Sequence, residues 1–197
     1  MDLRLVTPPT GEPVGLAEVQ EHLKALLSDS EAALVTTYIE GAREIVEGIT
    51  GRILMPQTWQ LRLDEWPDAG RGHIVLPLSP VRSITEIAYT NDAGASVVMP
   101  GADYQAKLPS GPYAQGAVVA PVAGTYWPSA AANTFGAVRV SFAAGYASQA
   151  AVPSALKTAI LLIVADMYEN RQASEARRYE DVPGVSRYLT PFMVFNP

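Results

Sequence analysis

The sequence predicts an α+β fold, in which a small helical bundle carries an inserted antiparallel β region and an extended C-terminal tail. Before residue 56 and again after Pro153, apolar residues recur every three or four positions, as in helices that are buried on one face. Between residues 57 and 145, short alternating runs are separated by prolines and glycines, which is typical of short antiparallel strands. Residues 172–197 contain several prolines and no helix-length apolar stripe, so they predict an extended tail.

Residues 1–56 are expected to form an N-terminal arm and two helices. Prolines and glycines punctuate the first fifteen residues and favour an extended arm. A first helix is predicted from residue 16 to about residue 27. The second helix has the strongest signal, because Ser28 can cap its start and Gly51 can end it. Its apolar stripe consists of Leu34, Val35, Tyr38, Ile39, Ala42, Ile45, Val46 and Ile49.

Residues 57–145 are expected to form the β insertion, of sandwich-like or small-sheet type, and residues 146–171 the third helix of the bundle. The helix begins after Pro153, because proline is favoured in a first turn. Each of the three helices has one apolar face that needs cover, so we expect them to pack together while the β region projects. Strands are predicted at residues 57–63, 73–76, 83–89, 96–98, 104–107, 117–120 and 137–142.

Composition limits the possible functions. The net charge of −6 disfavours a primary nucleic-acid binder, which would normally carry a basic patch. The chain has no cysteine, which excludes disulfides, thiolate metal sites and cysteine nucleophiles. The longest apolar run, residues 159–165, is far too short to span a bilayer, so we expect no membrane association.

No catalytic, cofactor-binding or metal-binding constellation is found in the sequence. His22 and His73 lack further ligands at metal spacing. The adjacent carboxylates Asp64 and Glu65 would point to opposite faces of a strand, so they cannot readily share a substrate. We therefore expect a protein that is not an enzyme.

The pattern resembles the head–tail connector (adaptor) family of tailed phages, which also occurs in gene transfer agents. The order and spacing of the matching stretches carry the resemblance over about residues 14–171. These stretches are Ala42-Arg43-Glu44-Ile45-Val46-Glu47, Thr50-Gly51-Arg52, Gln57-Thr58-Trp59, Leu76-Pro77-Leu78-Ser79-Pro80-Val81, Ile84, Ile87-Ala88-Tyr89, Trp127-Pro128, Val138-Arg139-Val140-Ser141-Phe142-Ala143-Ala144-Gly145-Tyr146, Val152-Pro153 and Met167-Tyr168-Glu169-Asn170-Arg171.

The resemblance implies a structural subunit at the head–tail junction of a virion or phage-like particle, assembled in the bacterial cytoplasm. It implies a homo-oligomeric ring of twelve copies, with the portal protein as one partner and a tail-side stopper or tail terminator protein as the other. DNA would pass through the lumen without specific binding. An acidic subunit suits that passage, because a like-charged lumen would not hold phosphates tightly.

The C-terminal tail, residues 172–197, is the expected portal-binding segment. Its crowded apolar residues are typical interface anchors, and its arginines could pair with acidic side chains of a portal. The resemblance points to the same segment. The alternative is that the tail folds back on its own domain. The expected portal-binding residues are Arg177, Arg178, Tyr179, Arg187, Tyr188, Leu189, Phe192, Met193 and Phe195.

Two other functions compete with this interpretation. One is another ring protein of the virion, acting in tail completion or as a tail terminator. The other is a β-rich ligand-binding module that uses Trp59, Trp66 and Trp127 as stacking faces. Two of these tryptophans stand beside prolines at strand ends, where packing explains them.

Overall fold

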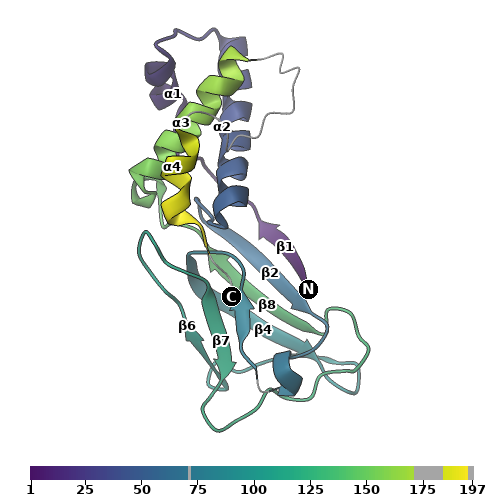
Figure 1. Cartoon of the computed structure of the whole chain (residues 1–197). Coiled ribbons are helices and arrows are strands. Elements are labelled where there is room, and N and C mark those ends of the chain that lie inside the picture. Colours follow the sequence, from purple (N-terminus) through teal and green to yellow (C-terminus); the bar gives the residue numbers. More distant parts are fainter. Residues whose placement is uncertain (71, 171–183, 195–197) are drawn as a thin grey trace. The chain divides into compact units, whose positions relative to one another are not determined.

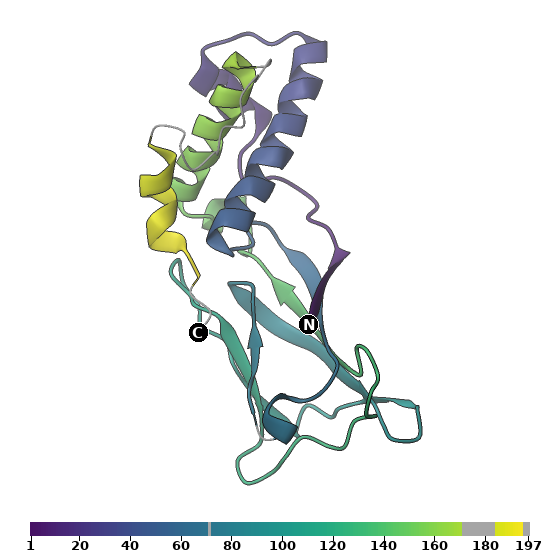
Figure 2. The same ribbon diagram turned by 45° about the vertical axis from the view of Figure 1, so that its right-hand side comes forward.

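The computed structural model describes residues 1–70, 72–170 and 184–194, and it has the predicted α+β architecture with antiparallel sheets. The chain divides into two compact units, each built from separate segments of the sequence. We call them the β unit (residues 1–8 and 56–145) and the helical unit (residues 9–55 and 146–194). Figures 1 and 2 show the strands of the first unit and the helices of the second.

The β unit contains a five-stranded sheet of order β1-β2-β8-β4-β5, in which every neighbouring pair is antiparallel. The central strand β8 lies between β2 and β4, and its side chains alternate strictly between buried and half-buried. That alternation places Val138, Val140, Phe142 and Ala144 on one covered face. The strands are β1 (Asp2–Thr7), β2 (Gln57–Leu63), β8 (Val138–Ala144), β4 (Val81–Thr90) and β5 (Ser96–Val98).

A second, three-stranded sheet completes the β unit. It has the order β3-β7-β6 and consists of β3 (Ile74–Leu76), β7 (Ala117–Pro121) and β6 (Tyr104–Lys107). One face of β3 and β7 is buried, through Ile74, Leu76, Ala117 and Val119. The short 3-10 turn η1 (Pro67–Gly70) precedes β3. Strands β2, β5 and β6 have the predicted bounds, because period-2 alternation and the flanking turn residues mark both of their ends.

The first residues of the chain differ from the expected arm. Residues 2–7 form β1, which pairs with β2 through partners such as Leu3 with Leu61 and Leu5 with Trp59. These residues therefore belong to the β unit and lie at one edge of the larger sheet. The backbone is extended as expected, but a strand partner supplies the hydrogen bonds that a free arm would lack.

The helical unit is built around α2 and α3. α2 (Asp29–Thr50) begins at the predicted cap, where the Glu31 amide and the Ser28 hydroxyl are 3.4 Å apart and the Ser28 amide donates to the Glu31 carboxylate over 3.1 Å. It ends at Gly51, whose φ of 68° suits glycine. α3 (Ser154–Glu169) packs against α1, α2 and α4 and buries Leu156, Ala159, Ile160, Ile163 and Val164.

The first helix is shorter than predicted. α1 (Leu16–Leu23) ends at Lys24, which adopts a left-handed backbone conformation with φ of 51°. Its amide donates back to the Glu21 carbonyl, so the last turn closes four residues before the predicted end. The apolar residue Leu27 packs on the core from the following loop.

The prediction of an extended C-terminal tail is wrong for residues 184–194, the part of the tail that the structure describes. Val185–Leu189 form α4 and Thr190–Phe192 form the 3-10 turn η4. Val185, Leu189 and Phe192 are spaced four and three residues apart, so they share one helical face, and that face joins the core of the helical unit. Pro191 lies in the first turn of η4, where a missing amide hydrogen costs little. None of the helices in the described residues is both long and apolar enough for a membrane span.

The helical unit should fold without the β unit. Met55 and Tyr146, which flank residues 56–145, both belong to its core. We expect a chain of residues 9–197, in which a short Gly/Ser linker replaces residues 56–145, to keep its helical circular dichroism and to unfold cooperatively. An Ile163→Ala change in the same chain should lower the free energy of unfolding by about 2–4 kcal/mol, because it removes core volume. Loss of helix in the unsubstituted deletion chain would contradict the division into units.

Candidate interaction surfaces

A buried arginine fixes the C-terminal end of the helical unit. Arg52 follows the glycine that ends α2, and it is 0% exposed. Its Nε donates to the Phe192 carbonyl, and its guanidinium lies 5.9 Å from the centre of the Phe192 ring. The amide of Val194 donates to the Thr50 carbonyl over 2.8 Å. Arg52 and Thr50 together attach residues 192–194 to the end of α2.

Polar groups contact Arg52, but no carboxylate of the described residues forms an ion pair with it. Burial lowers the pKa of Arg52 and raises the pKa of the Tyr146 phenol, while the interaction between the two side chains opposes both shifts. Burying a guanidinium is costly unless hydrogen bonds and charge–dipole interactions replace its water. The Phe192 carbonyl and ring and the Tyr146 phenol provide part of that replacement, while Nη1 and Nη2 are buried without a hydrogen-bond partner among the described residues. Three distant segments of sequence meet at this side chain.

A second arginine organises the other side of the helical unit. Arg43 Nε donates to Glu12 over 2.9 Å, and Nη1 donates to Glu47 over 2.8 Å. The other oxygen of Glu47 accepts from the Leu54 amide over 2.7 Å. The cluster therefore connects the segment before α1, the middle of α2 and the segment after it. Burial raises the pKa of Glu12 even though Arg43 acts to lower it.

The expected portal-binding residues differ in how far they are exposed. Leu189 and Phe192 are 1% and 4% exposed, because they pack into the helical core. Arg187 is exposed and lies over the ring of Tyr188, 4.8 Å from its centre. Tyr188 and Met193 are half-buried. The remaining expected residues, Arg177, Arg178, Tyr179 and Phe195, lie outside the described residues.

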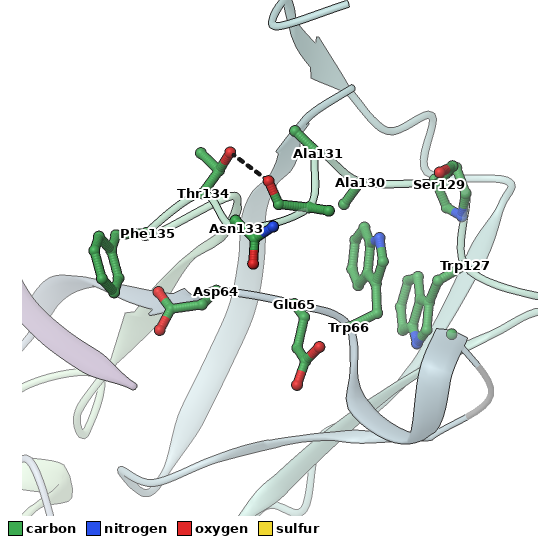
Figure 3. Close-up of a pocket in the computed structure, with 13 residues that line it drawn as sticks. Asp64, Glu65, Trp66, Trp127, Ser129, Ala130, Ala131, Asn133, Thr134 and Phe135 are labelled. Carbon is green, nitrogen blue, oxygen red and sulfur yellow. Dashed lines mark hydrogen bonds between the residues drawn. The ribbon is translucent and has the colours of Figure 1, made fainter. Parts of the chain in front are cut away.

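The tryptophans of the β unit pack against each other. Trp66 and Trp127 are stacked with ring centres 4.5 Å apart and planes 4° from parallel, and Trp127 donates to the Gly72 carbonyl over 2.8 Å. Figure 3 shows the two rings side by side. Both residues are buried, so little of either ring is exposed. This geometry bears out the packing explanation for these two tryptophans and disfavours a ligand-binding module that stacks on them.

A hollow of about 600 Å³ lies beside this aromatic pair. Residues 127–135 form one side of it, and residues 64–66, which follow β2, form another together with Gly70 (Figure 3). Asp64 Oδ1 accepts from the Gly136 amide over 2.7 Å, which ties this carboxylate to the loop before β8. Phe135, at the rim, is 93% exposed. Within the described parts of the chain, no three carboxylate or imidazole side chains come together in a metal-binding group.

The β unit exposes apolar residues that sequence reasoning did not single out. Tyr126 and Phe135 project from the loops around β8, Val98 projects from β5, and Leu5 and Val6 from β1. A signal was present in the sequence, since residues 108–138 contain no aspartate, glutamate, lysine, arginine or histidine. Uncharged exposed segments with aromatic residues are typical of protein–protein contacts.

Comparison with known proteins places this architecture among particle necks. No protein-family model and no curated protein matches the chain. It is similar to a chain in the neck of an empty gene transfer agent particle computed with C6 symmetry, at 25% identity and a TM-score of 0.80, covering 100% of this chain and 97% of the other. Chains in the virion of a native gene transfer agent particle and in the neck of a native particle computed with C12 symmetry share the fold at 23% and 24% identity, with TM-scores of 0.79 and 0.75 and the same coverage.

Replacement of the buried arginine should loosen the C-terminal segment. We expect Arg52→Ala to lower the free energy of unfolding by roughly 2–4 kcal/mol, because it leaves a cavity and an unpaired Phe192 carbonyl. Limited proteolysis should cut the C-terminal segment faster in this variant than in the parent protein. The control Arg187→Ala removes an exposed arginine and should change stability by less than about 0.5 kcal/mol. Equal stability of the Arg52→Ala variant and the parent would contradict the role given to this side chain.

Proposed function

We propose that this chain is a head–tail connector (adaptor) subunit, a structural protein without enzymatic activity in the neck of a phage or phage-like particle. The observation that carries the proposal is the full-length likeness to a neck chain of a gene transfer agent particle, at 25% identity and a TM-score of 0.80. The likeness covers both units and 97% of the other chain, so it concerns the complete architecture.

The described side chains support a structural role. Their buried charges, Arg43 and Arg52, have hydrogen-bond partners inside the helical unit. The apolar surface left exposed on the β unit is distributed over several loops and edges, which suits contacts with large neighbours. A subunit with these properties contributes shape and contact surface.

In more detail, we propose that twelve copies of the chain form a ring between the portal and a tail-side stopper or tail terminator, and that DNA passes through the lumen of this ring. The neck structures that contain the similar chains were computed with C6 and C12 symmetry, which supports a cyclic arrangement of this chain. The net charge of −6 supports passage of DNA without specific binding, because like charges do not hold phosphates. Assembly would take place in the bacterial cytoplasm, and the ring would remain at the head–tail junction.

For the portal side, we propose the C-terminal segment as the contact. Arg187 is exposed and Tyr188 is half-buried, so these two side chains can reach a neighbour while Leu189 and Phe192 keep the segment attached to its core. Arginine and tyrosine are enriched among the residues that dominate protein interfaces. The residues preceding α4, including Arg177, Arg178 and Tyr179, would extend the same contact.

The role as a connector is tested by removing the chain from particle production. Without it, filled heads and separate tails should accumulate, and supplying the protein to these extracts should restore joined particles. Electron microscopy of purified fractions measures the joined fraction directly. Normal joining in the absence of the chain would refute the proposed function.

The portal contact is tested by charge reversal on the exposed side of α4. We expect Arg187→Glu to reduce the number of copies per particle severalfold, because it places a carboxylate where a portal carboxylate would pair. The control Arg82→Glu reverses an exposed arginine on β4 and should leave occupancy unchanged. Quantitative mass spectrometry of purified particles gives the occupancy. Normal incorporation of the Arg187→Glu protein would place the contact elsewhere.

A further inference from the structure

We propose that neighbouring copies in the ring meet through opposite edges of the five-stranded sheet. The apolar corner of β1 on one copy, Leu5 and Val6, inserts into an apolar hollow beside β5 on the next copy. The inference rests on the proposed ring and specifies the surfaces that close it.

The β1 edge presents an apolar projection. β1 is the terminal strand of its sheet, so the outer side of its backbone has no strand partner among the described residues. The pairing with β2 shifts between Leu5 and Thr7, which leaves Val6 as the irregular residue. Leu5 and Val6 are 46% and 56% exposed. An open edge with exposed branched side chains readily pairs with another chain unless something covers it.

The β5 edge presents a matching hollow of about 310 Å³. Its lining is mainly apolar and includes Val98, Met99, Val122 and Tyr126. Val98 and Tyr126 are 58% and 66% exposed, so the hollow opens to the surface of the β unit. A leucine or valine side chain placed there would cover these two residues as well as itself, and about 25 cal/mol is gained for each Å² of apolar surface removed from water.

The position of the two surfaces fits a cyclic assembly. In the sheet order β1-β2-β8-β4-β5, the projection and the hollow lie at opposite ends. A ring requires this head-to-tail arrangement, in which one patch of each subunit meets a different patch of the next. A two-fold dimer would instead require one patch that is complementary to itself. The β1 projections of two copies are not complementary, because neither provides a hollow for the other.

Charge complementarity also indicates that the partner is a second copy of this chain. Asp103 is the one charged residue among those that line the hollow, and it is exposed. Arg4, two residues before Val6, is exposed and pairs over 3.1 Å with Asp2 on its own strand. An exposed pair of this kind contributes little to stability, so Arg4 can exchange Asp2 for Asp103 of the next copy at small cost. A second copy of this chain therefore supplies both the apolar side chains and the countercharge.

The absence of cysteine allows a direct test by crosslinking. A chain carrying both Val6→Cys and Val98→Cys should form a ladder of covalent multimers beyond the dimer when assembled particles are treated with a short bismaleimide. Neither single-cysteine variant should exceed a dimer. The control pair Val6→Cys and Arg82→Cys, which joins β1 to an exposed residue of the inner strand β4, should give no ladder.

The possible failures are distinct. Efficient dimer formation by Val6→Cys alone would show that two β1 edges meet, which overturns the inference. Particles with a visible ring but no ladder from the double variant would also overturn it and leave the proposed function intact. Particles in which the chain forms no ring would remove the proposed function itself. As an independent readout, Arg4→Glu and Asp103→Lys should each lower ring recovery, and their combination should restore it; no restoration would contradict the pairing.

Discussion

The helical unit depends on the burial of Arg52. This side chain stands where α2 ends, and it joins three segments that are far apart in sequence: the end of α2, Tyr146 shortly after β8, and the C-terminal turn. The Phe192 carbonyl accepts from its Nε, and the Tyr146 phenol interacts with the guanidinium, which offsets part of the cost of burying this charge. The C-terminal segment thereby belongs to the core, even though only a short helix of it packs there.

The two units differ in how much apolar surface they leave exposed. In the helical unit, the apolar faces of α1, α2, α3 and α4 cover one another, and Arg43 secures the flanking segments. In the β unit, the two small sheets bury one face of their strands but leave edges and loops with exposed aliphatic and aromatic residues. A protein that leaves apolar contact surface exposed on its β unit is suited to assembly, and the likeness to neck chains of gene transfer agent particles agrees with such contacts.

Much of the fold follows from the sequence where the local signals agree. α2 has a capping box, a helical period over its whole length and a terminal glycine, and its bounds match the prediction. Residues 185–192 differ from the extended prediction because their apolar residues cover barely two turns, too few for a period to stand out among prolines. β1 was missed although Asp2 to Leu5 alternate, because the prolines that follow dominate the local pattern. The burial of Arg52 could not be read from sequence, since arginine is ordinarily exposed and its partners lie about 90 and 140 residues away.

The most direct test of the account is a cryo-electron microscopy reconstruction of the neck of a purified particle that contains this chain. We expect a closed ring of copies at the junction of head and tail, with density for both units in every copy. We also expect the β units of neighbouring copies to touch through β1 and the hollow beside β5. Density for the chain in the capsid shell, in the tail tube or nowhere in the particle would contradict the central claim.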